Sequence, residues 1–489
     1  MTCRVSWPLF VSFRSLSRAY QEQSAVFKVR NLSREPTLRP AIRTGPPPNI
    51  PTNEDFSMRP VRIALLALIL ALLACWPYDN RLASSSRESS TATVPSTNWP
   101  QWRGPYRDAI SRETGLLSQW PKDGPPLLWE TKGLGQGYST VSVARGRLFT
   151  MGDRKDACHV ICLDAETGKE LWSAKVGKTG GSYPGPRSTP TVDGERVYAL
   201  GQFGDLVCLH VTDGRELWRK SLPNDFKGRK GDGWHYSESV LIDGEKLVCT
   251  PGGEEAPIVA LNKLTGNVIW KARIPGGVRA GHASMVIANV GVRQYIQLTA
   301  DAVVSVRASD GQLLWKWGQG KIAPNTANIP TPIVDGDKVF VTVGYGKGGG
   351  LLRLLPRANG CDVEEVYFER RLTNRHGGVV LVNGYLYGDR DNTGFPWCAE
   401  FATGKIMWSK QARGPGEGSA AILYADGKLY IRYDNGILAL VEATPKEYRE
   451  ISSFKIPHSS RQSWSHPVIC NGKLYLREQD YLMCYNLRP

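Results

Sequence analysis

The sequence of 489 residues has no apolar run long enough to cross a bilayer comfortably as a helix. Its longest run, from Ile63 to Ala74, has twelve residues, whereas a spanning helix needs about 20. Basic residues exceed acidic ones by 15, but they are scattered, and nucleic-acid-binding surfaces are typically basic patches or stripes. We therefore expect no nucleic acid partner, and contact with a membrane only through a lipid anchor.

The signatures of common catalytic centres are also missing. The chain contains no GxSxG, no HExxH and no pair of histidines at metal-ligand spacing, so it matches neither a serine-hydrolase elbow nor a zinc protease helix. From the sequence we assign no catalytic residue and no metal ligand, and whether the protein is an enzyme stays open.

The first 98 residues predict an export leader. Residues 1–57 lack hydrophobic periodicity and predict either a disordered segment or an extension upstream of a start at Met58. Residues 58–75 have two arginines, the apolar run and Ala74-Cys75, the layout of a secretory signal peptide; a transit-like leader or an uncleaved anchor are the alternatives. Residues 76–98 are rich in Ser and Thr and predict a flexible linker.

The end of this leader, LLAC, is similar to a bacterial lipoprotein processing site, in which Cys75 would be lipidated. Leu73 departs from that pattern, so cleavage with release is the alternative. In both cases we expect an exported protein of the periplasm or cell envelope, possessing a membrane anchor only if Cys75 is lipidated.

The rest of the chain is organised by an eleven-residue repeat. The stretch at 162–172, CLDAETGKELW, returns in variants at 208–218, 260–270, 305–315 and 398–408, each with Gly at the seventh position and Trp at the last. Degenerate copies end at Tyr367 and Phe454. Between copies lie strand–turn–strand patterns with DG or NG turns, a strong hairpin signal. Four strands in 40 to 50 residues match a propeller blade, with large-on-small packing of the Trp between neighbouring units.

Counting the copies predicts how the ring closes. Seven copies are complete, and the last hairpin with YLMCYN supplies only three strands before Pro489. Trp129, in PPLLWETKG, lies on a strand that has no hairpin of its own. We therefore predict an all-β fold for residues 99–489: an eight-bladed β-propeller of four-stranded antiparallel blades, the last closed by the N-terminal strand. Seven blades is the alternative.

The repeat resembles the tryptophan-docking motif of the pyrroloquinoline-quinone (PQQ) propeller superfamily, which opens with Ala and ends with Trp. Cys162, Cys208, Ser305 and Cys398 replace that Ala here. The resemblance covers residues 99–489 and implies that Trp wedges between blades without implying a bound cofactor. The docking residues are Trp129, Trp172, Trp218, Trp270, Trp315 and Trp408.

Cysteines in the opening position of the repeat predict small buried packing residues and no disulfide framework, although the chain is predicted to be exported. Cys162, Cys208, Cys398 and Cys484 occupy this position. Cys158 and Cys162 are four apart on one strand face, which is too far for a disulfide. We further expect Trp99 and Trp102, ahead of the ring, to cover an apolar patch on it.

The candidate site is the mouth of the central channel, where the loops before each blade's first strand converge. Polar and aromatic residues in these loops are candidate ligand-binding residues; the alternative is that they only satisfy loop backbone and water. They are Arg187, His235, Glu238, Arg279, His282, Asn328, His376, Glu417, Trp464 and His466.

Two functions follow from the resemblance. A PQQ dehydrogenase oxidising alcohols or sugars would need Ca²⁺ held by carboxylate and amide oxygens and an Asp base, and by resemblance many carry an adjacent Cys pair. This chain has no adjacent Cys pair and no CxxCH haem site. It is also similar to the outer-membrane assembly lipoproteins, eight-bladed propellers that organise partners without a cofactor. We therefore favour a monomeric binding scaffold with an unknown protein or small molecule at the mouth and no cofactor, and keep the dehydrogenase with PQQ and calcium as the alternative.

Overall fold

The computed structural model describes residues 98–489 apart from 323–325, 410–414 and 461. The predictions for 1–57, for the signal segment 58–75 with Cys75, and for nearly all of the linker therefore lie outside the described residues. In the described part, no helix is long and apolar enough to span a membrane.

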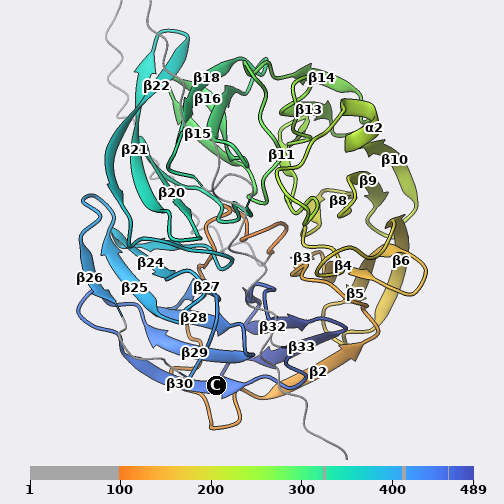
Figure 1. Ribbon diagram of the computed structural model, residues 1–489. Coiled ribbons are helices and arrows are strands. Elements are labelled where there is room, and N and C mark those ends of the chain that lie inside the picture. The colour runs from red at the N-terminus through yellow and green to blue at the C-terminus, as the bar shows by residue number, and fades with distance from the viewer. Residues whose placement is uncertain (1–97, 323–325, 410–414, 461) are drawn as a thin grey trace, which may run out of the picture. The chain divides into compact units, whose positions relative to one another are not determined.

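The described residues form eight four-stranded antiparallel sheets arranged as blades around a centre (Figure 1), which confirms the predicted fold. Blades 1 to 4 follow each other along the chain. Blade 1 contains β3 (Ser142–Ala144), β4 (Arg147–Asp153), β5 (Cys158–Asp164) and β6 (Glu170–Gly177). Blade 2 contains β7 (Thr191–Asp193), β8 (Arg196–Leu200), β9 (Asp205–His210) and β10 (Glu216–Ser221), and is followed by the short helix α2 (Leu222–Phe226). Blade 3 contains β11 (Leu241–Asp243), β12 (Lys246–Cys249), β13 (Val259–Asn262) and β14 (Val268–Lys271). Blade 4 contains β15 (Val286–Val290), β16 (Val292–Leu298), β17 (Val303–Arg307) and β18 (Leu313–Trp317).

Blades 5 to 8 complete the ring. Blade 5 contains β19 (Ile333–Asp335), β20 (Lys338–Val343), β21 (Gly348–Arg357) and β22 (Gly360–Glu369). Blade 6 contains β23 (Val380–Val382), β24 (Tyr385–Asp389), β25 (Pro396–Glu400) and β26 (Ile406–Ser409). Blade 7 contains β27 (Ala420–Ala425), β28 (Lys428–Tyr433), β29 (Ile437–Glu442) and β30 (Glu450–Lys455), with β1 (Ile110–Ser111) added in parallel to β27. Blade 8 contains β31 (Val468–Cys470), β32 (Lys473–Glu478), β33 (Tyr481–Asn486) and, from the other end of the ring, β2 (Leu127–Lys132).

The ring closes at blade 8 as the sequence predicts. Strand β2 pairs antiparallel with β33, and Trp129 lies opposite Cys484 in the register. This is the pairing that every undegenerated copy shows between its first and last residue. The other pairs are Cys162 with Trp172, Cys208 with Trp218, Ala260 with Trp270, Ser305 with Trp315, and Cys398 with Trp408.

The repeat's glycine is the small residue of the expected interblade packing. Gly168 of blade 1 lies under the Trp129 indole, where an added Cβ would come within 2.5 Å of the ring, and its φ of +69° favours glycine. Gly214 lies under Trp172 and Gly266 under Trp218 in the same way. The indole N–H can also bond to the next blade: Trp218 Nε1 donates to the Lys263 carbonyl of blade 3 at 3.0 Å. Trp172, Trp270 and Trp408 donate in the same way to carbonyls of the next blade. Trp315 Nε1 instead donates to Gln294 of its own blade, and Trp129 Nε1 is buried without a partner.

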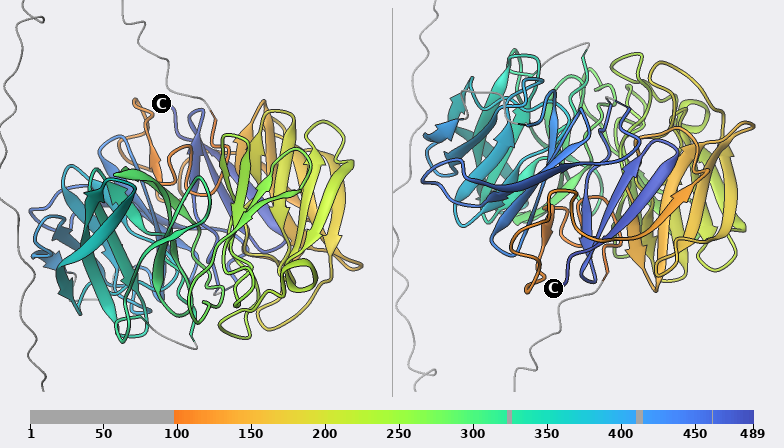
Figure 2. Two further views of the ribbon diagram at one scale, coloured as in Figure 1. Left: turned by 90° about the horizontal axis from the view of Figure 1, so that it is seen from above. Right: turned by 90° about the horizontal axis from the view of Figure 1, so that it is seen from below.

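Residues 99–111, which we call the plug segment, run across the centre of the ring (Figure 1, orange). Figure 2 shows this orange segment on the same side of the ring as the C-terminus. Trp99 is buried and forms a β-bridge with Val143 of β3, as expected for a residue that covers an apolar patch. Trp102 instead lines a central cavity, with its ring centroid 4.4 Å from that of His466. The expectation for this pair thus fits Trp99 and not Trp102.

Two buried arginines hold the plug segment in the ring. Arg107 donates to the carbonyls of Ser239 and Met285, each at 2.6 Å, in the loops before blades 3 and 4. Arg103 donates to the Val379 carbonyl before blade 6 at 2.6 Å. Burial lowers the pKa of both guanidinium groups to about 10, so both stay charged at neutral pH and their hydrogen bonds are charge-assisted.

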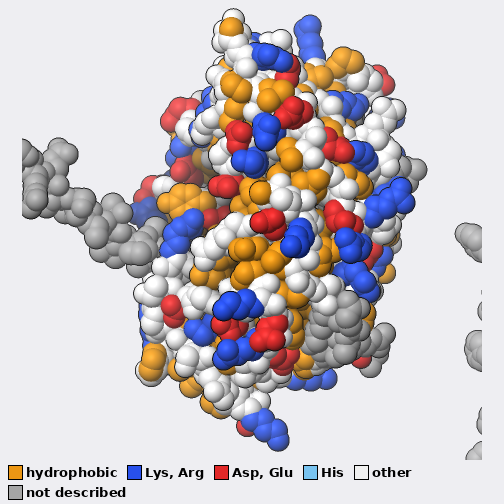
Figure 3. Space-filling model, turned by 90° about the vertical axis from the view of Figure 1, so that its left-hand side faces the viewer, with side chains coloured by type: hydrophobic (Ala, Val, Ile, Leu, Met, Phe, Trp, Pro, Cys, Tyr) orange, Lys and Arg blue, Asp and Glu red, His pale blue; other side chains and the backbone are white. Residues whose placement is uncertain are grey.

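All eight described cysteines are buried and none of them forms a disulfide with another described residue, including the four in the opening position of the repeat. Burial raises the pKa of the Cys162, Cys208, Cys398 and Cys484 thiols to about 12. They act as small packing residues, as predicted. On the outer rim of blades 5 and 6, basic, acidic and hydrophobic side chains are intermixed (Figure 3), and no basic patch gathers on that face.

Candidate functional site

A cavity of about 400 Å³ lies at one mouth of the central channel. Residues just ahead of first strands supply much of its wall, as the convergence of these loops predicts, and Trp102 of the plug segment contributes to it from below the mouth. A second cavity of about 410 Å³ lies between the plug segment and the first hairpins of blades 3 to 5. We refer to the first as the mouth cavity.

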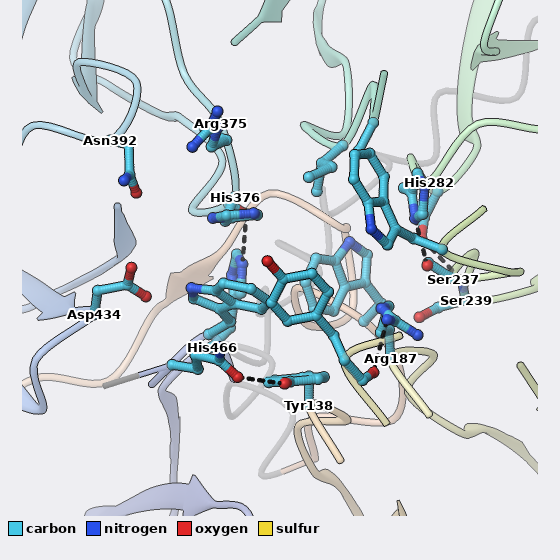
Figure 4. Close-up of a pocket in the computed structure, with 18 of the residues that line it drawn as sticks. Tyr138, Arg187, Ser237, Ser239, His282, Arg375, His376, Asn392, Asp434 and His466 are labelled. Atoms are coloured by element: carbon cyan, nitrogen blue, oxygen red, sulfur yellow. Dashed lines mark hydrogen bonds between the residues drawn. The ribbon is translucent and has the colours of Figure 1, made fainter. Parts of the chain in front are cut away.

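Five of the predicted site residues line the mouth cavity: Arg187, His282, His376, Trp464 and His466. They come from the loops before blades 2, 4, 6 and 8, so blades on opposite sides of the ring contribute (Figure 4). His376 stacks on Trp464 with ring centroids 4.5 Å apart. The His466 Nε2 and the His376 carbonyl oxygen are 3.2 Å apart, so these two loops are joined.

The other five predicted site residues do not line this cavity. Glu238 is buried and accepts hydrogen bonds from Thr250, and Asn328 is buried and donates to the Thr299 carbonyl. Arg279 pairs with Asp301, at 2.5 Å. His235 contacts Lys230 Nζ at 3.0 Å, and Glu417 is exposed beside blade 7.

Several lining residues were not predicted, and they come from two sources. Tyr138 precedes blade 1 as Arg187 precedes blade 2, and Arg375 directly precedes His376, so both stand in loops of the predicted kind. Tyr345, Asn392 and Asp434 instead follow second strands, in the turns after β20, β24 and β28. The sequence predicts convergence only for the loops before first strands, so it does not indicate this second group.

Aromatic rings form much of the cavity wall. Tyr138 and Tyr183 both pack near Trp464, with ring centroids 5.0 and 5.3 Å from it. Trp102 and Trp234 also line the cavity. Flat aromatic faces favour ligands with a stackable ring or an apolar face.

Arg187 and Arg375 supply the positive charge of the cavity. Arg187 donates to the carbonyls of Ser182, Tyr183 and Gly185, and no carboxylate of the described residues lies within ion-pair distance of it. Burial lowers its pKa. The Arg375 guanidinium lies 4.3 Å from the ring centroid of Tyr345, and its Nε is 3.6 Å from Asp391.

Asp434 is the one Asp or Glu among the described residues that line this cavity. Burial raises the pKa of its carboxyl to about 7, and its Oδ1 is buried with no hydrogen-bond partner. Burial lowers the pKa of His376 and His466 to about 3, helped by the charges of Arg375 and Arg103 respectively. At neutral pH both imidazoles are therefore neutral, and the two arginines leave the cavity with net positive charge.

Calcium-bound PQQ does not fit this set of side chains. Among the described residues, no group of three His, Cys, Asp or Glu side chains is placed to hold a metal ion. The amides of Asn392 and Gln462 also line the cavity, but the single carboxylate, Asp434, would have to serve both as the acidic calcium ligand and as the base.

Residues 98–489 thus form an eight-bladed, PQQ-like propeller with an aromatic, cationic mouth cavity. The sequence model of the family described as "Outer membrane protein assembly factor BamB" matches residues 156–410, just over half of the chain. The chain therefore belongs to this family.

Its relatives carry the same description. The outer membrane protein assembly factor BamB of Salmonella typhimurium is 25% identical over 331 residues, covering 65% of this chain and 78% of the relative. That of Escherichia coli K12 is 31% identical over 109 residues, covering 22% of this chain and 26% of the relative.

Solved structures share the fold at low identity. The quinohemoprotein alcohol dehydrogenase from Comamonas testosteroni has a TM-score of 0.56 at 12% identity and covers 81% of each chain. The computationally designed Ika8 protein has a TM-score of 0.51 at 10% identity, covering 74% of this chain and 99% of its own. These likenesses concern the fold alone, because function on a shared fold is decided by the site.

Proposed function

We propose that this protein is a binding scaffold of the cell envelope whose partner engages the mouth cavity, and that it works without a quinone cofactor. The observation that carries this proposal is the cavity itself: aromatic walls and two arginines face one carboxylate, Asp434. Such a set favours recognition through stacking and charge, and it offers only one carboxylate for the two roles, calcium ligand and base, that quinone chemistry needs filled.

The relatives support a protein partner. They are named outer membrane protein assembly factors, which is a role in assembling proteins. The dehydrogenase alternative is supported only by a likeness in fold, and the site chemistry argues against it. We therefore assign a protein partner to the mouth cavity rather than an alcohol or sugar substrate.

The charge of the cavity indicates which part of a partner would enter. Arg187 is largely buried and hydrogen-bonded only to carbonyls, so an acidic group on the partner would gain a charge-assisted hydrogen bond from it. The nearby rings of Tyr183 and Trp464 would stack on an aromatic or apolar neighbour of that group. The expected ligand is an acidic, aromatic-containing segment of an envelope protein.

We also propose that the protein is exported and acts in the cell envelope. The signal-like segment 58–75 directs export, and the linker 76–98 gives the propeller reach from the membrane if Cys75 is lipidated. Growth with an alkyne-labelled fatty acid, followed by detection of label in the purified chain, distinguishes anchoring from release. Cys75→Ala must abolish the label if Cys75 is the acceptor; label that persists in this variant excludes it.

Site-specific crosslinking tests the partner. Tyr183 lines the mouth cavity and is 42% exposed, whereas Tyr106 lines the second cavity and is 70% exposed. With p-benzoylphenylalanine at each position in the full chain, expressed in its own cells, we expect a discrete crosslinked envelope protein from position 183 and not from position 106. Loss of that product in Arg187→Ala completes the support. No product at 183, or the same products at both positions, contradicts the proposal.

A further inference from the structure

Three side chains at the edge of the mouth cavity form a hydrogen-bonded relay that the proposed function does not use. Ser237 Oγ lies 2.5 Å from His282 Nδ1, and His282 Nε2 lies 2.7 Å from Asp232 Oδ2. Asp232 and Ser237 belong to the loop before blade 3, and His282 to the loop before blade 4. Figure 4 shows Ser237 beside His282 at the cavity wall. Ser237 and His282 line the cavity. The relay therefore spans an interblade joint and ends in a serine at the cavity wall.

The position of each proton in this relay follows from Asp232. Burial alone would raise the pKa of this carboxyl, but the hydrogen bonds from His282 and from the Trp234 backbone, together with the nearby positive charge of Lys230, outweigh burial and lower the pKa. The carboxylate is also fixed by its Oδ1, which accepts the backbone N–H of Trp234 at 2.8 Å. An ionised carboxylate has no proton to donate, so Nε2 of His282 carries the hydrogen, and in the neutral form of the imidazole Nδ1 has a lone pair. That lone pair faces the Ser237 hydroxyl.

We propose that Ser237, His282 and Asp232 form a nucleophile–base–orienting triad that performs acyl transfer on small esters bound in the mouth cavity. A serine whose hydroxyl is bonded to an imidazole, which a carboxylate holds in turn, is the general signature of an activated nucleophile. The two ring nitrogens exchange the roles they have in the chymotrypsin-type triad, which is chemically equivalent because either nitrogen can act as base when the other is protonated. The triad is recognised by geometry and not by sequence position.

The reaction balances without a metal or a redox partner. Ser237 Oγ attacks the ester carbonyl carbon while its proton passes to His282 Nδ1, and the carbonyl π pair moves onto oxygen. Collapse of this intermediate breaks the bond to the alcohol, which leaves with the proton from Nδ1 and gives an acyl-Ser237 ester. Water then repeats the sequence: its proton goes to Nδ1, the acid is released, and Nδ1 returns the proton to Ser237 Oγ. Asp232 is a positioning residue that stabilises the transient imidazolium.

The cavity favours an aryl ester as substrate. Its volume of about 400 Å³ admits a small molecule, and the rings of Trp102 and Trp234 line the same space as Ser237. Arg187 lines the same cavity. Burial lowers the pKa of its guanidinium, and the negative charge of Asp232 partly offsets that lowering, so the two groups lie within electrostatic range. A cation lining the same cavity favours the negative charge that develops on the carbonyl oxygen. The activity is independent of the protein partner proposed above, and either can fail alone.

Labelling with a fluorophosphonate tests the nucleophile directly, because this probe phosphonylates activated serines far faster than ordinary ones. The full chain is incubated with the probe and digested, and the modified residue is identified by mass spectrometry. We expect modification of Ser237, its loss in Ser237→Ala, and a fall in labelling rate on the order of 10²–10⁴-fold in His282→Ala, the usual contribution of a general base. Hydrolysis of phenyl acetate should fall in the same variants.

Ser188→Ala is the matched control. Ser188 is buried in the corresponding loop before blade 2, and its hydroxyl has no hydrogen-bond partner, so its removal should leave labelling and hydrolysis unchanged. In Asp232→Asn the carboxylate no longer stabilises the imidazolium, and we expect the pH profile of labelling to move to lower pH while its maximum falls. A structural role alone would not move this profile.

The proposal is overturned if the parent chain is not labelled, if the modified residue is not Ser237, or if Asp232→Asn leaves the pH profile in place. The mapping on the parent chain decides the first two points even if Ser237→Ala does not fold. Crosslinking from Tyr183 and labelling of Ser237 are separate readouts, so loss of one does not imply loss of the other.

Discussion

Replacing Trp129 tests ring closure at a single side chain. Trp129 belongs to β2 at the start of the propeller, yet it lies opposite Cys484 near the end of the chain. Its indole packs on Gly168 of blade 1 and lies 6.1 Å from the Tyr475 ring of blade 8. Trp129→Ala therefore removes the side chain that joins the first blade to the last.

The expected loss is about 3 kcal/mol. Truncating a buried Trp to Ala costs roughly 3–5 kcal/mol, and Trp129 is only partly buried, so the lower end applies. For a body of about 390 residues, an unfolding entropy of roughly 2.1 cal/mol/K per residue gives about 0.8 kcal/mol/K. The same loss then lowers the Tm by about 4 °C.

Differential scanning calorimetry of the full chain measures this shift, with two matched variants. Leu128→Ala changes the adjacent residue, which is 48% exposed, and should move the Tm by less than about 1 °C. Trp218→Ala removes the same wedge at the joint between blades 2 and 3 and, because Trp218 is buried and hydrogen-bonded across that joint, should cost at least as much as Trp129→Ala. If Trp129→Ala melts with the parent while Trp218→Ala does not, β2 does not close the ring.

Two further outcomes follow from buried titratable groups. Burial raises the pKa of Glu238 to about 7, above its value of about 4.5 in the unfolded chain. The folded state therefore binds the proton more tightly, and the free energy of unfolding falls as the pH rises from about 4.5 to about 7. In urea titrations we expect Glu238→Gln to be more stable than the parent at pH 8, by up to about 3 kcal/mol, and nearly equal to it at pH 4.5. Equal stability of the two proteins at both pH values would contradict this effect of burial. The eight described cysteines are buried, and burial raises the pKa of the Cys158 and Cys249 thiols well above the usual range. In a chain with Cys3 and Cys75 replaced by Ser, Ellman's reagent should therefore react with the remaining thiols only after denaturation. Rapid reaction with the native protein would disprove the packing role of these eight cysteines.

The sequence predicts the fold in detail because each copy of the repeat carries two independent signals, the hairpin turns and the spacing between its first and last residue. The hairpin turns set four strands per copy, and the spacing from Cys162 to Trp172 places each opening residue opposite its closing Trp. The partnership of Trp129 with Cys484 follows from counting copies alone. What the spacing does not show is that Gly168 is the small surface under the neighbouring indole, since that contact joins two blades.

Only the part of the candidate site that comes from the loops before first strands could be predicted from the sequence. Arg187 and His376 precede first strands and line the mouth cavity, but Glu238, also ahead of a first strand, is buried against Thr250 in blade 3. Position in a loop does not fix side-chain direction, which depends on the neighbouring blade. Asp232 and His282 are 50 residues apart and meet across such a joint, so no local motif could have indicated them.

The central claim is a mouth cavity that binds a partner without a quinone cofactor, and a titration of the full chain with PQQ and excess Ca²⁺ tests it most directly. The cofactor's absorption spectrum is recorded at each addition, and dye-linked oxidation of alcohols and sugars is measured at the end point. Because Asp434 is the one carboxylate among the described residues lining the cavity, we expect no saturable spectral change and no turnover. Saturable binding accompanied by alcohol or sugar oxidation would contradict the proposed function.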